Sequence, residues 1–193
     1  MNGPVVGPDG LARCPWGGST PDYLGYHDDE WGRPVHGTPA LYERLCLEAF
    51  QSGLSWLTIL RKRPAFRAAF ADFEPARVAA FDEHDVRRLL ADAEIVRNRA
   101  KVEATIANAQ AILALDRDFD ELLWSFAPGD GRPAPVTGAD VPAVTPESTA
   151  MAKALKREGF RFVGPTTAYA LMQATGMVND HLAGCAFREP SAP

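Results

Sequence analysis

The chain has 193 residues, a formal net charge of −5 at pH 7, and 46% hydrophobic residues. This length suits a single domain with a sizeable buried core, and the composition is typical of a globular protein. The negative charge argues against a protein that coats polyanions without specificity, because such proteins carry a broad basic footprint. It leaves room for a local basic patch.

The cysteine content and the absence of long apolar runs indicate the compartment. Cys14, Cys46 and Cys185 are an odd number, which fits a reducing cytoplasm better than a disulfide framework. The first ten residues are rich in glycine and proline and do not resemble a signal peptide, and no later run is long enough to cross a membrane. We therefore expect a cytoplasmic protein without membrane contact, with residues 1–11 as a flexible tail and residues 12–190 as one domain.

Apolar residues at intervals of three and four predict an all-α fold. The expected helices run from Leu41 to the break at Ser52–Gly53, from Trp56 onward, from about Phe81 to Leu90, from Asn98 to Leu115, and from Pro146 to Glu158. Asp82 and Thr145 are suited to N-caps and Gly159 to a helix terminator. Residues 127–143, rich in proline, glycine and aspartate, predict a surface loop or a seam between two helical lobes.

Cysteine and histidine form a pair near each end of the chain, Cys14 with His27 and His181 with Cys185. Two thiolates and two imidazoles make the closed tetrahedral set that zinc takes in structural sites. The spacing of four between His181 and Cys185 places both on one face if that stretch is helical. If all four converge, the ion joins the N-terminal segment to the C-terminal one. The alternative is two buried thiols and two ordinary histidines.

Glu48 lies at the border of the apolar stripe of its predicted helix. A carboxylate there is partly desolvated, so it either meets a hydrogen-bond donor or serves a site. The helix then breaks before Leu54 and Trp56, and such a Gly-Leu tip can push an apolar wedge outward. The alternative is an ordinary corner between helices with Trp56 in the core.

A short aromatic-rich region surrounds the first histidine of the proposed metal site. Trp16, Tyr23, Tyr26 and Trp31 lie within sixteen residues of one another. Aromatic faces can sandwich a planar heterocycle, and a tyrosine hydroxyl can bond its edge. The alternative is a satellite core packed over the N-terminal segment.

The stretch after the helix that ends near Gly159 predicts an anion-binding turn. Gly164 leads into a helix whose first residues include Thr166, and the free N–H groups of such a helix end hold a phosphate without a basic residue. This arrangement grips one DNA strand through its backbone and reads no sequence. Nearby cations supply local positive charge: Lys153, Lys156, Arg157 and Arg161. The alternative is a solvated helix end.

Several segments together resemble the 3-methyladenine DNA glycosylase I family. They are Arg13–Trp16, Tyr26–Gly32, Cys46–Trp56, Phe160–Gly164 and Val178–Cys185. They follow the order of the family and span residues 13–187. The resemblance implies a helix–hairpin–helix DNA glycosylase fold with a structural zinc that joins the two terminal segments through Cys14, His27, His181 and Cys185.

The resemblance also implies roles for the pocket residues. Glu48 matches the carboxylate that recognises the base, Trp56 the tryptophan that stacks on it, and Tyr26 the pocket tyrosine. Trp16 and Tyr23 match other aromatic residues that line the pocket. Gly53 and Leu54 match the tip that fills the gap left in the duplex.

The implied activity is hydrolysis of the N-glycosidic bond of 3-methyladenine in alkylated double-stranded DNA, which releases the base and leaves an abasic site. We expect a monomeric, monofunctional enzyme, because no lysine is placed as a Schiff-base nucleophile for strand cleavage. Asp180 lies near the position of a catalytic aspartate in the wider superfamily and is a candidate helper only.

Two residues depart from the family pattern. Phe162 stands where the hairpin of the wider superfamily often has a second glycine, so the phosphate grip is expected to differ in detail. Phe50 stands beside the pocket helix where a polar residue is expected, so the pocket rim is expected to differ too.

Two other classes of function remain open from the sequence. One is a DNA-binding module that is stabilised by a structural zinc and has no catalytic activity. The other is a hydrolase with a catalytic zinc, which needs three protein ligands and an open position for water.

Overall fold

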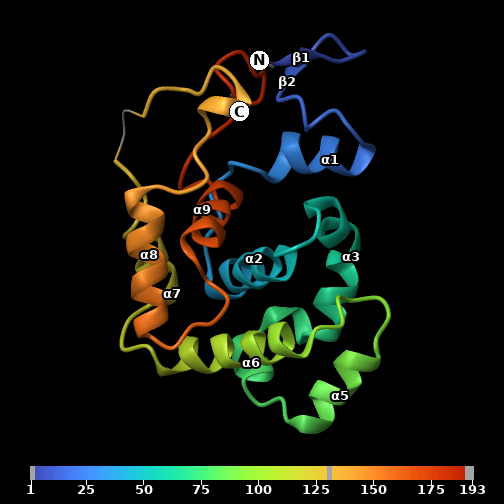
Figure 1. Cartoon of the computed structure of the whole chain (residues 1–193), viewed down its shortest axis with the longest axis vertical. Coiled ribbons are helices and arrows are strands. Elements are labelled where there is room, and N and C mark those ends of the chain that lie inside the picture. Colours follow the sequence, from blue (N-terminus) through green and yellow to red (C-terminus); the bar gives the residue numbers. More distant parts are fainter. Residues whose placement is uncertain (1–2, 130–131, 190–193) are drawn as a thin grey trace.

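The computed structural model describes residues 3–129 and 132–189. In this part of the chain the regular elements are β1 (Val5–Val6), β2 (Ala12–Arg13), α1 (Pro21–Gly25), the π-helical turn η1 (Tyr26–Glu30), α2 (Thr38–Gln51), α3 (Trp56–Ala69), η2 (Ala71–Phe73), α4 (Pro75–Val78), α5 (Glu83–Ala91), α6 (Arg99–Ala114), α7 (Phe119–Trp124), η3 (Gly138–Asp140), α8 (Pro146–Arg157) and α9 (Pro165–Ala174). The predicted helical class is therefore confirmed (Figure 1).

Side-chain caps set the starts of the main helices. Asp82 accepts hydrogen bonds from two N–H groups of α5, and Asn98 accepts one from the first turn of α6. Thr145 caps α8 and is followed by a proline at the first helical position. These residues satisfy donors that have no partner inside the helix, which is why the predicted starts of α5, α6 and α8 agree closely with the structure.

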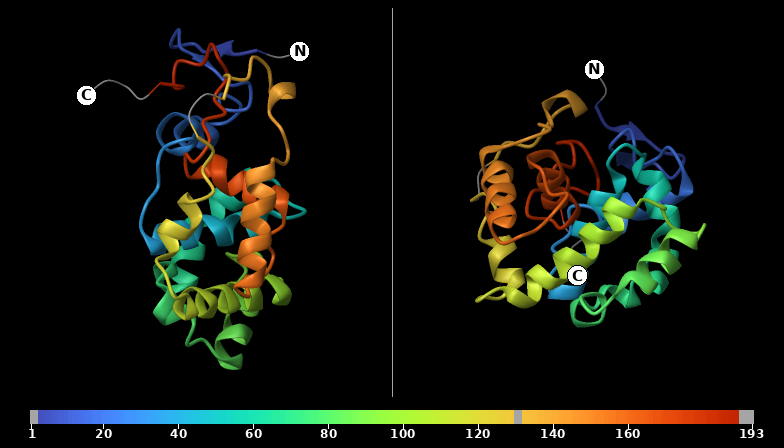
Figure 2. Two further views of the ribbon diagram at one scale, coloured as in Figure 1. Left: turned by 90° about the vertical axis from the view of Figure 1, so that its left-hand side faces the viewer. Right: turned by 60° about the horizontal axis from the view of Figure 1, so that its bottom comes forward.

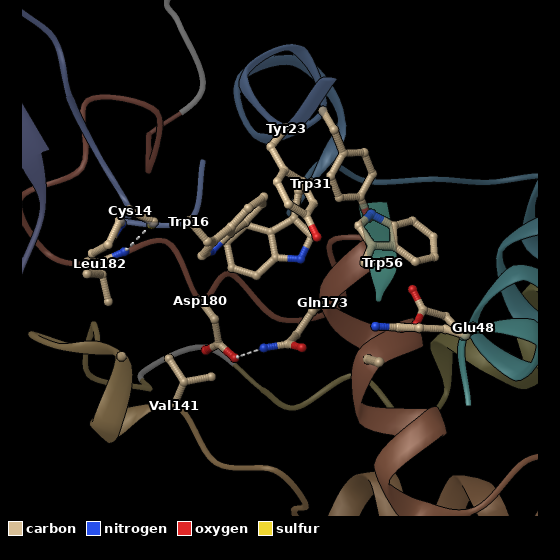
Figure 3. A pocket seen from close by; sticks show the side chains of 15 residues that line it. Cys14, Trp16, Tyr23, Trp31, Glu48, Trp56, Val141, Gln173, Asp180 and Leu182 are labelled. Atoms are coloured by element: carbon tan, nitrogen blue, oxygen red, sulfur yellow. Dashed lines mark hydrogen bonds between the residues drawn. The ribbon is translucent and has the colours of Figure 1, made fainter. Parts of the chain in front are cut away.

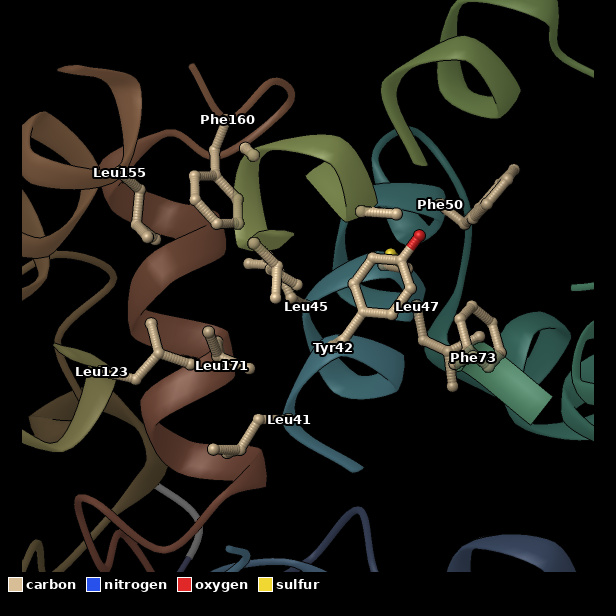
Figure 4. Packing of buried hydrophobic residues seen from close by; sticks show 14 of the residues in the cluster. Leu41, Tyr42, Leu45, Leu47, Phe50, Phe73, Leu123, Leu155, Phe160 and Leu171 are labelled. Atoms are coloured by element: carbon tan, nitrogen blue, oxygen red, sulfur yellow. The ribbon is translucent and has the colours of Figure 1, made fainter. Parts of the chain in front are cut away.

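Helix α2 is the centre of the fold. It packs against α9 on one side and against α3 and α6 on the other, and α8 packs on the outer side of α9 (Figure 1). Leu41 and Leu45 of α2 lie toward Leu171 of α9 in the main hydrophobic core (Figure 4). This core holds α2 rigidly, and α2 carries Glu48.

Phe50 corrects an expectation from the sequence. Its side chain is fully buried and packs on Phe66 and Phe70, at centroid distances of 4.6 and 6.0 Å. Phe50 therefore belongs to the core between α2 and α3 and does not form the pocket rim. A helix that is buried on several faces, as α2 is, accepts an aromatic residue where a polar one was expected.

The two ends of the described chain meet at one end of the molecule. Val5–Val6 pairs antiparallel with Ala12–Arg13, a two-residue ladder that the sequence analysis did not predict. The Ala186 N–H donates to the Ala12 carbonyl at 2.8 Å, so the C-terminal segment lies against the N-terminal one (Figure 2). Residues 3–11 thus have defined contacts, and the flexibility expected for residues 1–11 stays a prediction; Met1 and Asn2 lie outside the described residues.

Residues 127–143 belong to the connection from α7 to α8, and their described part, 127–129 and 132–143, runs along the outside of the helices (Figure 1). Apart from the short η3 turn, the described part of this stretch is irregular, as predicted. The Ala183 N–H donates to the Pro135 carbonyl, which ties the loop to the C-terminal segment. A division of the domain into two lobes at this loop stays a prediction. Across residues 3–129 and 132–189, no helix has the length and apolarity required to cross a bilayer.

Candidate active site and metal centre

A cavity of about 360 Å³ opens between the N-terminal segment, α2, α3 and α9. Its volume lies in the range of small-molecule sites. The five residues predicted for the pocket all line it: Trp16, Tyr23, Tyr26, Glu48 and Trp56. Figure 3 shows Glu48 beside Trp56 on one side, with Trp16 and Trp31 on the other.

Glu48 is the unpartnered acid of this cavity. Its residue is 6% exposed, and no donor in the described part of the chain hydrogen-bonds its carboxyl. Burial raises the pKa of Glu48 to about 8, and the charge of nearby Arg44 lowers it only in part. Carboxyl groups left in this state are costly and usually serve a site.

Aromatic rings form the opposite walls. Tyr26 and Trp56 have ring centroids 5.4 Å apart with planes inclined at 47°, and Trp16 meets Trp31 edge to face at 5.0 Å. The Tyr23 hydroxyl accepts a hydrogen bond from the Leu57 N–H at 3.0 Å, which fixes the start of α3. Because α3 begins at Trp56, this bond also fixes the position of that indole.

Burial raises the pKa of the Tyr26 phenol, and the neighbouring Glu48 carboxylate raises it further. The hydroxyl therefore stays protonated and can donate. Tyr26 opens the π-helical turn η1, which continues directly from α1. Such turns are rare and frequently mark functional sites.

A fixed polar network forms part of the cavity wall. Asp180, 2% exposed, accepts hydrogen bonds from the Tyr169 hydroxyl and from the Gln173 amide nitrogen at 2.9 Å. Arg132 lies 3.4 Å from the other Asp180 oxygen. The candidate helper identified in the sequence thus faces the cavity (Figure 3), but its oxygens already have donors.

The four predicted metal ligands converge at a buried centre next to the cavity. One ligand atom from each of Cys14, His27, His181 and Cys185 lies within 4.8 Å of all the others. The Cys185 sulfur is 3.6 Å from His27 Nε2 and 3.5 Å from His181 Nδ1. A tetrahedral ion with Zn–S of about 2.3 Å and Zn–N of about 2.0 Å separates its sulfur and nitrogen ligands by roughly 3.5 Å. The donor set can therefore hold a metal ion.

The second nitrogen of each histidine ring is already engaged. His27 Nδ1 is 2.7 Å from Asp28, whose carboxylate also accepts from Arg13, and His181 Nε2 is 2.9 Å from the Trp31 carbonyl. These bonds direct His27 Nε2 and His181 Nδ1 to the centre, as outer partners of metal-bound histidines do. Burial lowers the pKa of both imidazoles, which favours the neutral form that binds metals.

The packing around the centre is close. A Cβ at Gly17 would lie 2.5 Å from the His27 ring, so this position requires glycine. Trp16 meets the same ring edge to face at 5.1 Å, and Cys14 and Trp16 both line the cavity. The metal centre and the aromatic wall are therefore one packed unit.

The predicted DNA contacts lie outside the cavity. Gly53 has a φ of 82°, and Leu54 is 43% exposed at the turn between α2 and α3. Gly164 precedes α9, and Thr166 is exposed in its first turn. Phe162, in the hairpin between α8 and α9, has a φ of 57°, the left-handed region that favours glycine. Phe162 therefore adopts a backbone conformation at this turn that a glycine would adopt at less cost.

Among the lining residues that the sequence analysis did not assign to the pocket, Trp31, Gln51 and Gln173 carry the largest polar or aromatic side chains. Trp31 was visible as part of the aromatic region, and Gln51 lies three residues after Glu48 on the same helix. Gln173 carries no local signal, because it reaches the cavity only through the packing of α9 on α2.

The fold is helical, and its cavity places aromatic rings opposite a buried carboxyl, an arrangement suited to the class of proteins that bind a planar ring. Within that class the chain belongs to the methyladenine glycosylase family, whose model matches residues 16–189. DNA-3-methyladenine glycosylase 1 of Escherichia coli (strain K12) is 45% identical over 179 residues, which cover 91% of this chain and 96% of that protein.

Solved structures of the family have the same fold. A crystal structure of 3-methyladenine DNA glycosylase I matches with a TM-score of 0.85 at 47% identity, over 90% of this chain and 98% of that one. A structure on 3-methyladenine recognition by the Staphylococcus aureus enzyme matches with a TM-score of 0.85 at 37% identity, over 93% and 98% of the two chains.

Proposed function

We propose that this protein is a monofunctional DNA glycosylase that hydrolyses the N-glycosidic bond of 3-methyladenine in alkylated double-stranded DNA. The free base is released and an abasic site remains. The observation that carries the proposal is Glu48, a buried carboxyl that faces aromatic rings across a cavity and has no hydrogen-bond donor among the described residues. The activity named for the similar enzymes supports the same substrate.

Glu48 suits the outer edge of an adenine ring, where the 6-amino donor lies beside the N7 acceptor. Because the pKa of Glu48 is about 8, the carboxyl holds a proton at neutral pH in the free protein. A protonated carboxyl offers one donor and one acceptor, which match that edge. The protonated Tyr26 hydroxyl supplies a further donor.

Trp56 stacks on the extruded base. Stacking of a base on an aromatic side chain contributes about 1–3 kcal/mol, and a base that still carries the alkylation charge gains cation–π attraction. Trp16 and Tyr23 line the remaining aromatic wall. These terms offset the cost of unstacking the nucleotide, which is about a few kcal/mol and smaller for a damaged base.

The chemistry needs little from the protein beyond binding. Methylation at N3 makes the nucleoside a cation, so the C1′–N9 bond is already weak. When this bond breaks, its electron pair goes to the base, which leaves as a neutral molecule, and water adds to C1′ and loses a proton. The sugar passes through an oxocarbenium-like state that needs electrostatic shelter. A carboxylate held in place near the sugar can provide this stabilisation, and Asp180, which is fixed by its hydrogen-bond donors, is the candidate for that role.

The exposed turns provide the contacts to the duplex. Leu54, presented by Gly53, fills the space that the extruded nucleotide leaves. The first turn of α9, after Gly164 and including Thr166, binds a backbone phosphate through its free N–H groups. The packed pair α8 and α9 then acts as a helix–hairpin–helix element.

The donor set suits zinc in a structural site. Two cysteines and two histidines would hold the ion with four protein ligands, and no position would remain for a catalytic water. The ion would join the N-terminal segment, with Trp16 and Tyr26, to the segment after α9. It supplies charge neutralisation of the thiolates and no step of the reaction.

Strand cleavage is not part of the activity. The lysines of this chain are Lys62, Lys101, Lys153 and Lys156, and none of them lines the cavity. A Schiff base with the abasic sugar requires an amine at that place. We further propose that the enzyme works as a monomer, since one chain supplies the cavity walls, and that it acts in the cytoplasm, as its odd cysteine count favours.

The test is to incubate the purified protein with methylated duplex DNA and to identify the released bases by mass spectrometry. We expect free 3-methyladenine, intact strands that break only on later alkali treatment, and no release from unmethylated DNA. Binding of methylated DNA without release of any base would assign the chain to the non-catalytic DNA-binding class instead.

A further inference from the structure

The turn that presents Leu54 begins where α2 ends, and helix ends leave backbone carbonyls without partners inside the helix. Two of these carbonyls are satisfied within the turn itself. The Ala49 carbonyl accepts from the Ser52 N–H at 3.3 Å, and the Gln51 carbonyl accepts from the Leu54 N–H at 2.7 Å. The second of these bonds includes the exposed leucine.

Two further carbonyls of the same helix end are satisfied by one side chain from another helix. Lys101, on α6, donates from its Nζ to the Phe50 carbonyl at 2.8 Å and to the Ser52 carbonyl at 2.6 Å. Helix α6 packs against α2 (Figure 1). The ammonium group therefore bridges the last turn of α2 and the residue that precedes Gly53.

Apart from these two hydrogen bonds, the surroundings of Lys101 disfavour a positive charge. It lies in the first turn of α6, where the helix dipole disfavours positive charge. The residue is 7% exposed, burial lowers its pKa, and no carboxylate within the described ranges forms an ion pair with it. Compensation comes from the carbonyl end of α2, whose dipole favours a cation. A residue that breaks a local rule in this way commonly serves a site.

The bridged segment separates two walls of the cavity. Gln51, just before the turn, and Trp56, just after it, both line the cavity. Gly53 between them has a φ of 82°, and Leu54 projects with 43% of its surface exposed. A turn of this kind holds one conformation only if its backbone groups are fixed.

We propose that Lys101 is a positioning residue for duplex binding: it holds the Ser52–Leu54 turn in the conformation that inserts Leu54 beside the extruded base. The inference rests on the proposed function, in which Leu54 fills the gap in the duplex. Lys101 does not line the cavity, so it touches neither the base nor the reacting atoms. Its contribution is preorganisation, which acts on binding of the duplex and not on binding of the free base.

The test compares Lys101→Met with Lys62→Met. Lys62 also donates to two backbone carbonyls, those of Ala93 and Glu94, but on the loop after α5, so it is the matched control. Each variant is titrated with a duplex that contains a stable abasic-site analogue and, separately, with free 3-methyladenine. We expect Lys101→Met to weaken duplex binding about tenfold, by the loss of preorganisation. Its affinity for the base and all properties of Lys62→Met should stay at the wild-type level.

A double-mutant cycle tests whether Lys101 acts through the exposed leucine. In a Leu54→Ala background, Lys101→Met should cause no further loss of duplex affinity, because Lys101 then has no leucine side chain to position. Three results would each overturn the inference. The losses of duplex affinity from Lys101→Met and Leu54→Ala could add, Lys101→Met alone could leave duplex affinity unchanged, or it could weaken binding of the duplex and of the free base equally. If Lys101→Met does not fold, Lys101→Gln, which keeps an N–H donor, should show a smaller loss of the same selective kind. Failure of the wild type to bind the duplex or the base would instead refute the proposed function.

Discussion

Replacement of Glu48 by glutamine tests the site with the smallest change in shape. In the free protein Glu48 is buried, accepts no hydrogen bond from the part of the chain that the structure describes, and has a pKa raised to about 8. The glutamine amide keeps one donor and one acceptor, as the protonated carboxyl does, so we expect free 3-methyladenine to bind the variant within a few-fold of the wild type. What the variant lacks is the ability to become an anion.

The alkylated nucleotide is a cation, and its entry favours the ionised form of Glu48. A hydrogen bond to a charged group contributes about 1.5–3 kcal/mol, so Glu48→Gln should reduce kcat/KM for methylated DNA by roughly 10- to 100-fold. The assay is release of labelled 3-methyladenine with DNA well below KM. A variant with the wild-type kcat/KM would remove Glu48 from the site.

The pH profile supplies an independent signature. Because kcat/KM reports ionisation in the free enzyme, the wild-type value should rise with pH through about 8, and the Glu48→Gln value should not. Affinity for the neutral free base should change in the opposite direction in the wild type, since that base needs the protonated carboxyl. The free energy of unfolding should fall as the pH rises, as the affinity for the free base does. The raised pKa of Glu48 favours folding at low pH, and this contribution is lost between the ordinary pKa of 4.5 and about 8. Identical pH profiles for the two proteins would refute the reasoning.

Further predictions concern the other parts of the site. Trp56→Ala should weaken binding of free 3-methyladenine by about 1–3 kcal/mol in calorimetry, and a loss of less than twofold would place the indole outside the base site. Elemental analysis should find one zinc per chain in the wild type and less than half of that in Cys185→Ala. Removal of the metal by a chelator should lower the temperature of thermal unfolding, and a metal-free protein of full stability would contradict the structural role. Leu54→Ala should raise KM for duplex DNA and leave free-base affinity unchanged, and an unchanged KM would exclude the wedge. Phe50→Ala should reduce the free energy of unfolding by about 3–5 kcal/mol in urea denaturation, whereas a loss below about 1 kcal/mol would contradict its place in the core.

Local chemistry explains what the sequence could predict. Asp82, Asn98 and Thr145 are capping residues, and a cap acts on the turn that follows it, so the starts of α5, α6 and α8 are visible in a short window. The metal ligands were recognisable because two Cys/His pairs together make a tetrahedral donor set, although the spacing of Cys14 and His27 carries little signal, and the resemblance implied the same four residues.

Tertiary packing explains what the sequence could not predict. The β1–β2 pair has two residues per strand and lies against Ala186 from the other end of the chain, which no local pattern reveals. The short helix α1 was missed, although Thr20 followed by Pro21 is a start signal, because five residues carry no apolar period. The place of Phe50 in the core could not be predicted, because its burial depends on the ring of Phe66 on α3 that packs against it.

The central claim, that the aromatic cavity receives the damaged base, is tested most directly by mapping bound 3-methyladenine on the protein by NMR. The account predicts that the indole N–H signals of Trp16 and Trp56 shift on titration with the base, and that the Trp124 signal, whose N–H is bonded to the Val35 carbonyl away from the cavity, stays in place. Shifts that cluster elsewhere on the surface, or a base that binds with no change at Trp56, would contradict it.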